Sequence, residues 1–299
     1  MTSEALRDGP QPSTSVPSSG DILEIFDQLV SEEVIIYGPH DVIKQDYDGY
    51  PLEFRICPSL AKKPHTVGAP LKIGLDDDGK FGPGSDLYYV DKRLKLSRLN
   101  NSHTLALNLF SVDKPQFMIL TTDSYRRQHE AMDQDDFVAA LQVLNALDDI
   151  YVIYNCTEVA GCSRSHKHMQ GLKGPPTAFE LFIHGDEQET RIPFKHFSHH
   201  FKEAFGATHA QDVFTVYKTL LGRAKEALGV SEDDDLCPHN VVLWKDRMIV
   251  IPRRAAALGR ASGNAAGMLG SIWVPDQSVV DEWMRFGCGN VMRHLGVPQ

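Results

Sequence analysis

The segment GCSRSHKHMQGLKG, residues 161–174, contains two histidines and a glutamine at strict two-residue spacing. Successive side chains of a β-strand point to opposite faces, so His166, His168 and Gln170 would share one face of such a strand. Their Cα atoms would lie about 6.5 to 7 Å apart, which allows two neighbouring functional groups to flank one substrate atom. The segment therefore predicts a polar strand face that can carry chemistry.

Small and hydroxyl-bearing residues precede the histidines, and an asparagine ends the apolar run before them. Gly161, Ser163 and Ser165 offer hydroxyl donors and a flexible backbone whose N–H groups can surround a phosphate, with Asn155 close by in the sequence. An imidazole is about half neutral near pH 6.5, and the neutral ring is a competent nucleophile toward phosphorus. Its attack on a phosphate ester would form a covalent phosphoramidate and divide one difficult displacement into two easier steps.

Three other interpretations of this segment compete with a nucleophile. Cys162, His166 and His168 carry side chains that bind metals, with Cys156 nearby, but their spacing does not match a zinc finger, and we predict no metal site. The histidines could instead form a hydrogen-bonded structural pair, the usual role of an isolated H-x-H. A site that binds a nucleotide without performing chemistry is the third alternative.

The composition limits the class of protein. The chain has 299 residues, 42% of them hydrophobic, which is enough for one large core, and a formal net charge of −10. This charge argues against broad nucleic-acid or membrane binding, so an anionic ligand must be held by a few local cations and backbone N–H groups. No apolar run approaches the roughly 20 residues that span a bilayer, and the five cysteines do not form a disulfide framework. We expect a soluble cytoplasmic protein, with the nucleus as an alternative location.

Apolar periodicity predicts a mixture of helices and hairpins. Residues 1–20 are rich in Ser, Pro and Thr and are expected to form a disordered tail. The elements predicted after it are a helix starting at residue 21, a hairpin of strands 103–110 and 116–122, a helix over 133–150, strands 151–156 and 178–183, a helix over 210–230 and a hairpin over 239–252. This order predicts an α+β fold built on an antiparallel sheet.

The wider sequence resembles a known family. YNCTEVAGCSRSHKHMQ (154–170) resembles the H-x-H-x-Q motif of the fungal diadenosine tetraphosphate phosphorylases (ATP adenylyltransferases). They form a branch of the histidine-triad superfamily that is more distantly related to galactose-1-phosphate uridylyltransferase. Four further blocks follow the family's order: CPSLAKKP (57–64), residues 103–132, HNVVLWKDRMIVIPRR (239–254) and NAAGMLGSIWV (264–274).

The resemblance implies a histidine-triad-like antiparallel sheet flanked by helices, with one nucleotidyltransferase domain over residues 21–299. His168 would attack the α-phosphate of diadenosine tetraphosphate, release ATP and carry AMP, which inorganic phosphate would then accept as ADP. His166 would orient and support this nucleophile. Gln170 stands where hydrolytic relatives carry a third histidine, and its amide would donate to a phosphoryl oxygen, which suits transfer to phosphate.

Matching the blocks also implies a set of substrate-binding residues. They are Lys63 for polyphosphate, Asn108 for the nucleotide, Asn155 and the loop of Gly161, Cys162, Ser163 and Arg164 for phosphate, and Asn264 in a C-terminal substrate-binding stretch. The chain also departs from the family pattern: Leu109 replaces a lysine, Ser271 a methionine and Pro275 a lysine that contacts substrate. The nucleophile strand thus follows the pattern, whereas cations near the polyphosphate are fewer.

The expected ligands are a dinucleoside polyphosphate, ATP, ADP and inorganic phosphate, with Mg²⁺ present as part of the nucleotide complex and no tightly bound cofactor. Two alternative functions remain at this point. One is a phosphorylase or transferase for another nucleotide conjugate, such as a nucleotide sugar, and the other is a non-catalytic nucleotide-binding sensor. Arg253 and Arg254, which follow an apolar run, are expected to be solvated charges.

Overall fold

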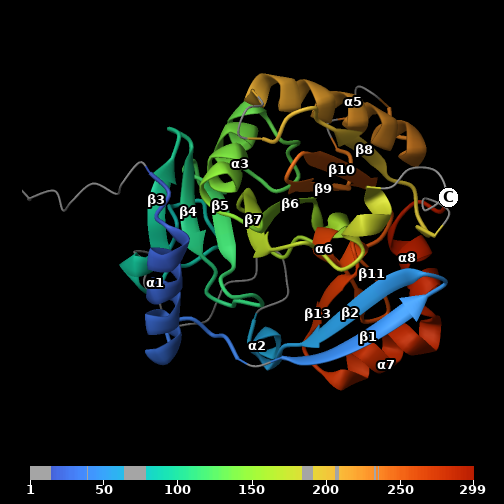
Figure 1. The fold of residues 1–299 in the computed structure, drawn as a ribbon, viewed down its shortest axis with the longest axis horizontal. Helices are drawn as coiled ribbons and strands as arrows, with labels where there is room; N and C mark the ends of the chain where they lie inside the picture. Colours follow the sequence, from blue (N-terminus) through green and yellow to red (C-terminus); the bar gives the residue numbers. More distant parts are fainter. Residues whose placement is uncertain are drawn as a thin grey trace, which may run out of the picture.

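An antiparallel sheet of eight strands organises the molecule (Figure 1). The computed structural model describes residues 15–38, 40–63, 79–183, 191–205, 209–231, 234 and 236–299. The strand order is β3-β4-β5-β7-β6-β9-β10-β8, and every neighbouring pair is antiparallel. The strands are β3 (Lys95–Leu99), β4 (His103–Leu107), β5 (Phe117–Thr121), β6 (Ile150–Cys156), β7 (His168–Lys173), β8 (Phe197–His200), β9 (His239–Trp244) and β10 (Arg247–Pro252).

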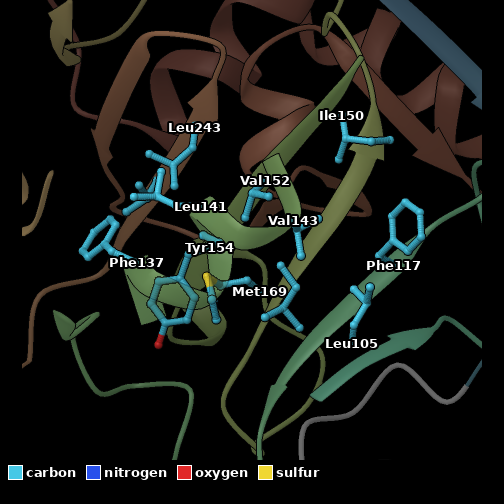
Figure 2. Packing of buried hydrophobic residues seen from close by; sticks show 14 of the residues in the cluster. Leu105, Phe117, Phe137, Leu141, Val143, Ile150, Val152, Tyr154, Met169 and Leu243 are labelled. Carbon is cyan, nitrogen blue, oxygen red and sulfur yellow. The ribbon is translucent and has the colours of Figure 1, made fainter. Parts of the chain in front are cut away.

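Helices α1 (Ser19–Ser31), α3 (Gln134–Ala146) and α5 (Ala210–Leu228) cover one face of this sheet (Figure 1). Alternate residues of the central strands, such as Val152 and Tyr154 of β6, point into the core beneath them. Figure 2 shows Phe137 and Leu141 of α3 beside these strand residues. Burial of such large apolar side chains is the main stabilising contribution of this layer.

A second layer packs on the opposite face, against the other alternate residues of β6 and β9, such as Ile153 and Val242. Its elements are a sheet of β1 (Asp41–Tyr47), β2 (Tyr50–Ile56) and β13 (Ser271–Val274), the hairpin of β11 (Ala257–Leu258) and β12 (Ala261–Ser262), and helices α2 (Pro58–Ala61), α6 (Ala265–Met268), α7 (Gln277–Phe286) and α8 (Cys288–Leu295). Within this sheet β13 runs parallel to β2. The central strands are therefore buried on both faces.

The second layer covers only the C-terminal part of β7, so the N-terminal part of the strand lines a pocket. Leu172 is part of the second core, whereas His168 and Gln170, on the same face of the strand, line pockets. Next to them Met118 and Leu120 of β5 form a small separate apolar cluster. The face over β4, β5 and β7 is thus left for a ligand rather than for another layer of the fold.

The predicted α+β class, both hairpins and the three long helices are confirmed. The predicted strand over 178–183 is wrong: Phe179–Phe182 form a 3₁₀ turn that buries its apolar side chains in the second core. The sequence prediction also missed the β1–β2 hairpin and helices α7 and α8. Helix α1 begins at Ser19, inside the predicted 1–20 tail, and residues 1–14 of that tail lie outside the described residues.

A buried ion pair joins Lys167, the residue before β7, to Asp136 of α3. Lys167 Nζ lies 2.6 Å from Asp136 Oδ2 and also donates to the Ala131 carbonyl, and the Lys167 and Asp136 side chains are 1% and 2% exposed. Burial would raise the pKa of Asp136, but the hydrogen bond from His103 and the charge of Lys167 outweigh it and lower this pKa to about 2. The carboxylate is therefore ionised throughout the physiological range.

We predict that Lys167→Met lowers the free energy of unfolding by about 3 to 5 kcal/mol, because it leaves the Asp136 carboxylate buried without its cation. The matched control is Lys114→Met, which removes the exposed Lys114–Asp27 pair and should change this free energy by about 1 kcal/mol or less. Urea unfolding monitored by circular dichroism measures both values. Equal losses in the two variants would contradict a structural role for the buried pair.

Candidate active site

Two adjoining pockets form a cleft over β4, β5 and β7, and they share Lys63, Asn108, Ser163 and Gln170. All predicted site residues line this cleft except His166 and Asn155. The first pocket contains His168 and has apolar walls that include Phe81, Leu87, Tyr88 and Met118. The second is bounded on its far side by one face of β13, from which Ser271 and Trp273 point, and by Asn264.

The backbone of His168 is fixed by a glutamine from a loop 40 residues earlier. The side-chain Oε1 of Gln128 accepts from the His168 N–H at 2.8 Å, and its Nε2 donates to the His168 carbonyl at 2.9 Å and to the Asn155 carbonyl at 3.1 Å. Gln128 therefore ties the start of β7 to the end of β6. These bonds extend the sheet ladder at the point where the strands separate around the site.

The imidazole of His168 is held in one tautomer. Its Nδ1 lies 2.8 Å from the His166 carbonyl oxygen, which only accepts, so Nδ1 carries the proton and donates it. Burial lowers the pKa of His168 to about 4, and its side chain is 5% exposed. The ring is thus neutral at pH 7, and the lone pair lies on Nε2. This is the protonation state that a nucleophilic histidine requires.

His166 supports His168 through its backbone rather than from within the cleft. Its side chain is fully buried, with Nδ1 2.7 Å from Ser85 Oγ and Nε2 2.9 Å from the Thr121 carbonyl. The Thr121 carbonyl requires a proton on Nε2, so Nδ1 accepts from the Ser85 hydroxyl. Burial lowers the pKa of His166. The expected orienting role is therefore carried by the carbonyl of this residue.

Gln170 presents a donor to the cleft. Val112 N–H donates to Gln116 Oε1 at 3.0 Å, and Gln116 Nε2 donates to Gln170 Oε1 at 2.9 Å. Because its oxygen is occupied, the Gln170 amide nitrogen is directed to the cleft, where it can donate to a phosphoryl oxygen. The chain of amides fixes this orientation.

Two cations lie at the junction of the pockets. Lys63 is partly buried, and burial together with the charge of Arg164 lowers its pKa to about 8. Arg164 is 3% exposed, and its Nη1 donates to the Ser163 carbonyl at 2.6 Å. Among the described residues, Lys63 has no acidic partner within ion-pair distance. A partly buried cation without an acidic partner can bind an anionic ligand.

The loop 157–164 packs against the N-terminus of α6. Gly161 has φ +90°, and a Cβ there would lie 2.9 Å from the Asn264 Cα, so this close approach requires glycine. Asn264 caps α6 by accepting from Gly267 N–H at 3.1 Å, and it lines the second pocket. Burial raises the pKa of the Cys162 thiol to about 12, which makes it an unreactive wall residue.

Asn155 and Arg253 are both buried in a hydrogen-bonded network beside the cleft. Asn155 is 2% exposed, and its Oδ1 accepts from Asn240 Nδ2 and from Ala265 N–H, both at 2.9 Å. Arg253 is 1% exposed and donates to the Asn240 side chain and to the Ala160 and Gly263 carbonyls. The prediction of a solvated Arg253 is wrong, because this side chain joins the loop to the α6 segment.

The residues that differ from the family pattern all lie in the walls of the cleft. Leu109 is nearly buried in the first pocket, and Ser271 and Pro275 belong to the second. The Ser271 hydroxyl accepts from the Thr177 N–H at 3.0 Å. Leu109 lines the pocket that contains His168, whereas Ser271 and Pro275 line only the second pocket, so these differences concern the walls of the cleft.

Sequence reasoning missed Gln116, Gln128, Ser85 and Asp86. Gln116 and Gln128 lie within the 103–132 block that matched the family pattern, so this match could have pointed to them. Ser85 and Asp86 lie in a Gly-rich stretch that reads only as a loop. Their function depends on contacts across 80 residues of sequence, which periodicity does not reveal.

Over the described ranges, no three His, Cys, Asp or Glu side chains are grouped so that they could hold a metal ion. The same part of the chain contains no helix with both the length and the apolar character needed to cross a membrane.

Comparison with known proteins divides the chain into two matched segments. Residues 53–181 match the family described as the Ap4A phosphorylase N-terminal domain, and residues 190–298 match the ATP adenylyltransferase C-terminal domain. Protein APA1 of Saccharomyces cerevisiae is 27% identical over 247 residues, covering 74% of this chain and 75% of its own length. Diadenosine 5',5'''-P1,P4-tetraphosphate phosphorylase 2 of the same yeast is 26% identical over 212 residues, covering 61% and 65%.

Solved structures share the fold. The crystal structure of yeast Ap4A phosphorylase Apa2 in complex with AMP has a TM-score of 0.75 at 21% identity, over 95% of this chain and 98% of that one. Its complex with Ap4A has a TM-score of 0.73, over 95% and 99%. The likeness confirms the predicted fold class across nearly the whole chain.

We predict that His168 stays neutral, with its proton on Nδ1, down to about pH 4, because burial disfavours the charged ring. Nitrogen-15 NMR of histidine-labelled protein, assigned by comparison with His168→Asn, measures the tautomer and the titration. A proton on Nε2, or a midpoint near the ordinary value of about 6.5, would contradict the geometry.

Proposed function

Because this chain belongs to the Ap4A phosphorylase and ATP adenylyltransferase family, we propose that it converts diadenosine tetraphosphate and inorganic phosphate to ADP and ATP through a nucleotidylated His168. The observation that carries the proposal is the bond from His168 Nδ1 to the His166 carbonyl. It leaves Nε2 as the nucleophilic atom, in a cleft that also holds two cations and the Gln170 amide.

In the first step, the Nε2 lone pair attacks the phosphorus of one terminal AMP unit. The Nε2–P bond forms as the bond from phosphorus to the bridging oxygen breaks, and ATP departs with the electrons of that bond. His168 keeps its Nδ1 proton, so the adduct is a cationic imidazolium. The His166 carbonyl stabilises this charge by accepting a charge-assisted hydrogen bond.

In the second step, an oxygen of inorganic phosphate attacks the same phosphorus. The O–P bond forms, the Nε2–P bond breaks, and its electrons return to Nε2, which restores the neutral ring and releases ADP. The cationic ring is a good leaving group because it departs as neutral imidazole. No proton has to be moved by the histidine in either step.

Other residues of the cleft would stabilise the negative charge of the polyphosphate. Lys63 and Arg164 are placed to stabilise the negative charge that develops on the departing polyphosphate, and Gln170 to donate to a non-bridging oxygen. The low-dielectric surroundings that lower the pKa of His168 also strengthen these interactions. We further propose that the polyphosphate enters as its Mg²⁺ complex, which chelation with EDTA tests.

We expect purified protein to release ATP and ADP together from diadenosine tetraphosphate only when phosphate is present, as resolved by anion exchange. His168→Ala should lower turnover by at least about 1,000-fold while nucleotide binding is largely kept, because the covalent step is lost. The control is His199→Ala on the exposed edge strand β8. AMP and ATP formed without phosphate, or full activity of His168→Ala, would overturn the proposal.

Lys63→Met should lower kcat/KM by about 10- to 100-fold, because a charge-assisted contact to the polyphosphate is lost. The neighbouring exposed Lys62 provides the matched control, Lys62→Met. Since the pKa of Lys63 is lowered to about 8, its charge is present below pH 8 and lost above it, so kcat/KM of the unmodified enzyme should fall above pH 8. If kcat/KM of Lys63→Met also falls above pH 8, the loss of activity at high pH belongs to another group.

A further inference from the structure

The loop 79–89 contacts both the first pocket and the strand that carries His168. The loop is closed by a bridge between Lys80 and Tyr88 and by the Tyr89 N–H donating to the Gly79 carbonyl at 2.7 Å. At its tip Gly84 packs on the 124–125 turn, where a Cβ would lie 2.7 Å from the Ser124 carbonyl oxygen. The tip is therefore held tightly against the strand system.

Asp86 holds the backbone just before the nucleophile. Its two carboxylate oxygens accept from the Ser165 N–H at 2.7 Å and from the His166 N–H at 2.9 Å. Burial would raise the pKa of Asp86, but these hydrogen bonds outweigh it and the pKa is lowered. The ionised carboxylate thus fixes two successive backbone amides, and such bonds to a charged acceptor are stronger than neutral ones.

Ser85 holds the side chain of the same residue. Its hydroxyl is 2.7 Å from His166 Nδ1, on the opposite edge of the ring from the bond to the Thr121 carbonyl. Neighbouring residues of one loop therefore hold His166 at its N–H and at its ring. With these positions fixed, the His166 carbonyl is aimed at His168 Nδ1 at 2.8 Å.

The same loop supplies Phe81, Leu87 and Tyr88 to the wall of the first pocket. A ligand that packs against this wall presses on the segment that contains Ser85 and Asp86. Contact with the ligand and alignment of the nucleophile are therefore properties of one short, closed loop. This arrangement is an example of a binding element that orients a reactive group through a second residue.

We propose that Ser85 and Asp86 are positioning residues that fix the tautomer and direction of His168 through His166, and that they couple occupancy of the first pocket to alignment of the nucleophile. Only the catalytic consequence rests on the proposed function, since the tautomer of His168 is a property of the free protein. Neither residue contacts the reacting atoms, because both act through the His166 backbone and ring.

The first test is nitrogen-15 NMR of the Ser85→Ala, Asp86→Asn and double variants, each without ligand. We expect His168 to change from a single Nδ1–H tautomer to a mixture of both tautomers, most strongly in the double variant. Asp91→Asn is the matched control, because Asp91 is a carboxylate five residues further along that pairs with Arg93 at the surface, and it should leave the spectrum unchanged. An unchanged His168 tautomer in a folded Ser85→Ala and a folded Asp86→Asn would overturn the proposal.

The second test is kinetic. In the variants kcat should fall by about 10- to 100-fold while KM changes by less than about threefold, because alignment is lost and most binding contacts remain. A rise in KM with kcat unchanged would overturn a positioning role. If the unmodified protein shows no phosphorolysis, the proposed function fails, and the NMR result still decides whether the two residues position His168.

Discussion

The buried ion pair between Lys167 and Asp136 determines which residues of the His168 segment face the cleft. Lys167 points to α3, so the residues on either side of it in the sequence must point to the other face of the strand. A slip of one residue would place a charged ammonium in the cleft and His168 in the helical core. Such pairs add little net stability because desolvation is costly, but the alternative registers would leave both charges unpaired. The pair therefore acts as a register constraint.

This constraint allows a neutral nucleophile to lie beside cations. A protonated histidine next to Lys63 and Arg164 would be repelled, and burial already holds the pKa of His168 at about 4. Different residues of the site are therefore available for charge stabilisation and for bond formation, so neither depends on a change in the charge of the other. In the proposed reaction, charge stabilisation belongs to the lysine and the arginine, and bond formation belongs to a ring whose Nδ1 proton is donated to the His166 carbonyl. The amide of Gln170 adds a donor without adding another titration.

The sequence alone predicted the part of this arrangement that lies within one strand. Two-residue spacing correctly placed His168 and Gln170 on one strand face, since a strand's geometry is contained in its own residues. The His166 ring does not line the cleft, because it is enclosed by Ser85 of the 79–89 loop and by the Thr121 carbonyl at the end of β5. Gln128, Ser85 and Asp86 were out of reach because each acts on a residue 40 or more positions away. The identity of such partners is decided by tertiary packing, which one sequence without its fold does not specify.

The two matched segments meet inside one sheet, so neither half contains the complete cleft. Strand β6 of the first segment pairs with β9 of the second. Across that seam Asn240 and Arg253 donate to the Ala160 carbonyl of the 157–164 loop, and Arg253 also donates to the Gly263 carbonyl before α6. The first segment supplies His168, Lys63 and Gln170, and the second supplies the far wall with Ser271 and Pro275. The proposed chemistry is thus encoded in the first segment, whereas the pocket walls come from both. The proposed reaction therefore needs both segments, because the first carries His168 and the second completes the adjoining pocket through Asn264 and the β13 residues.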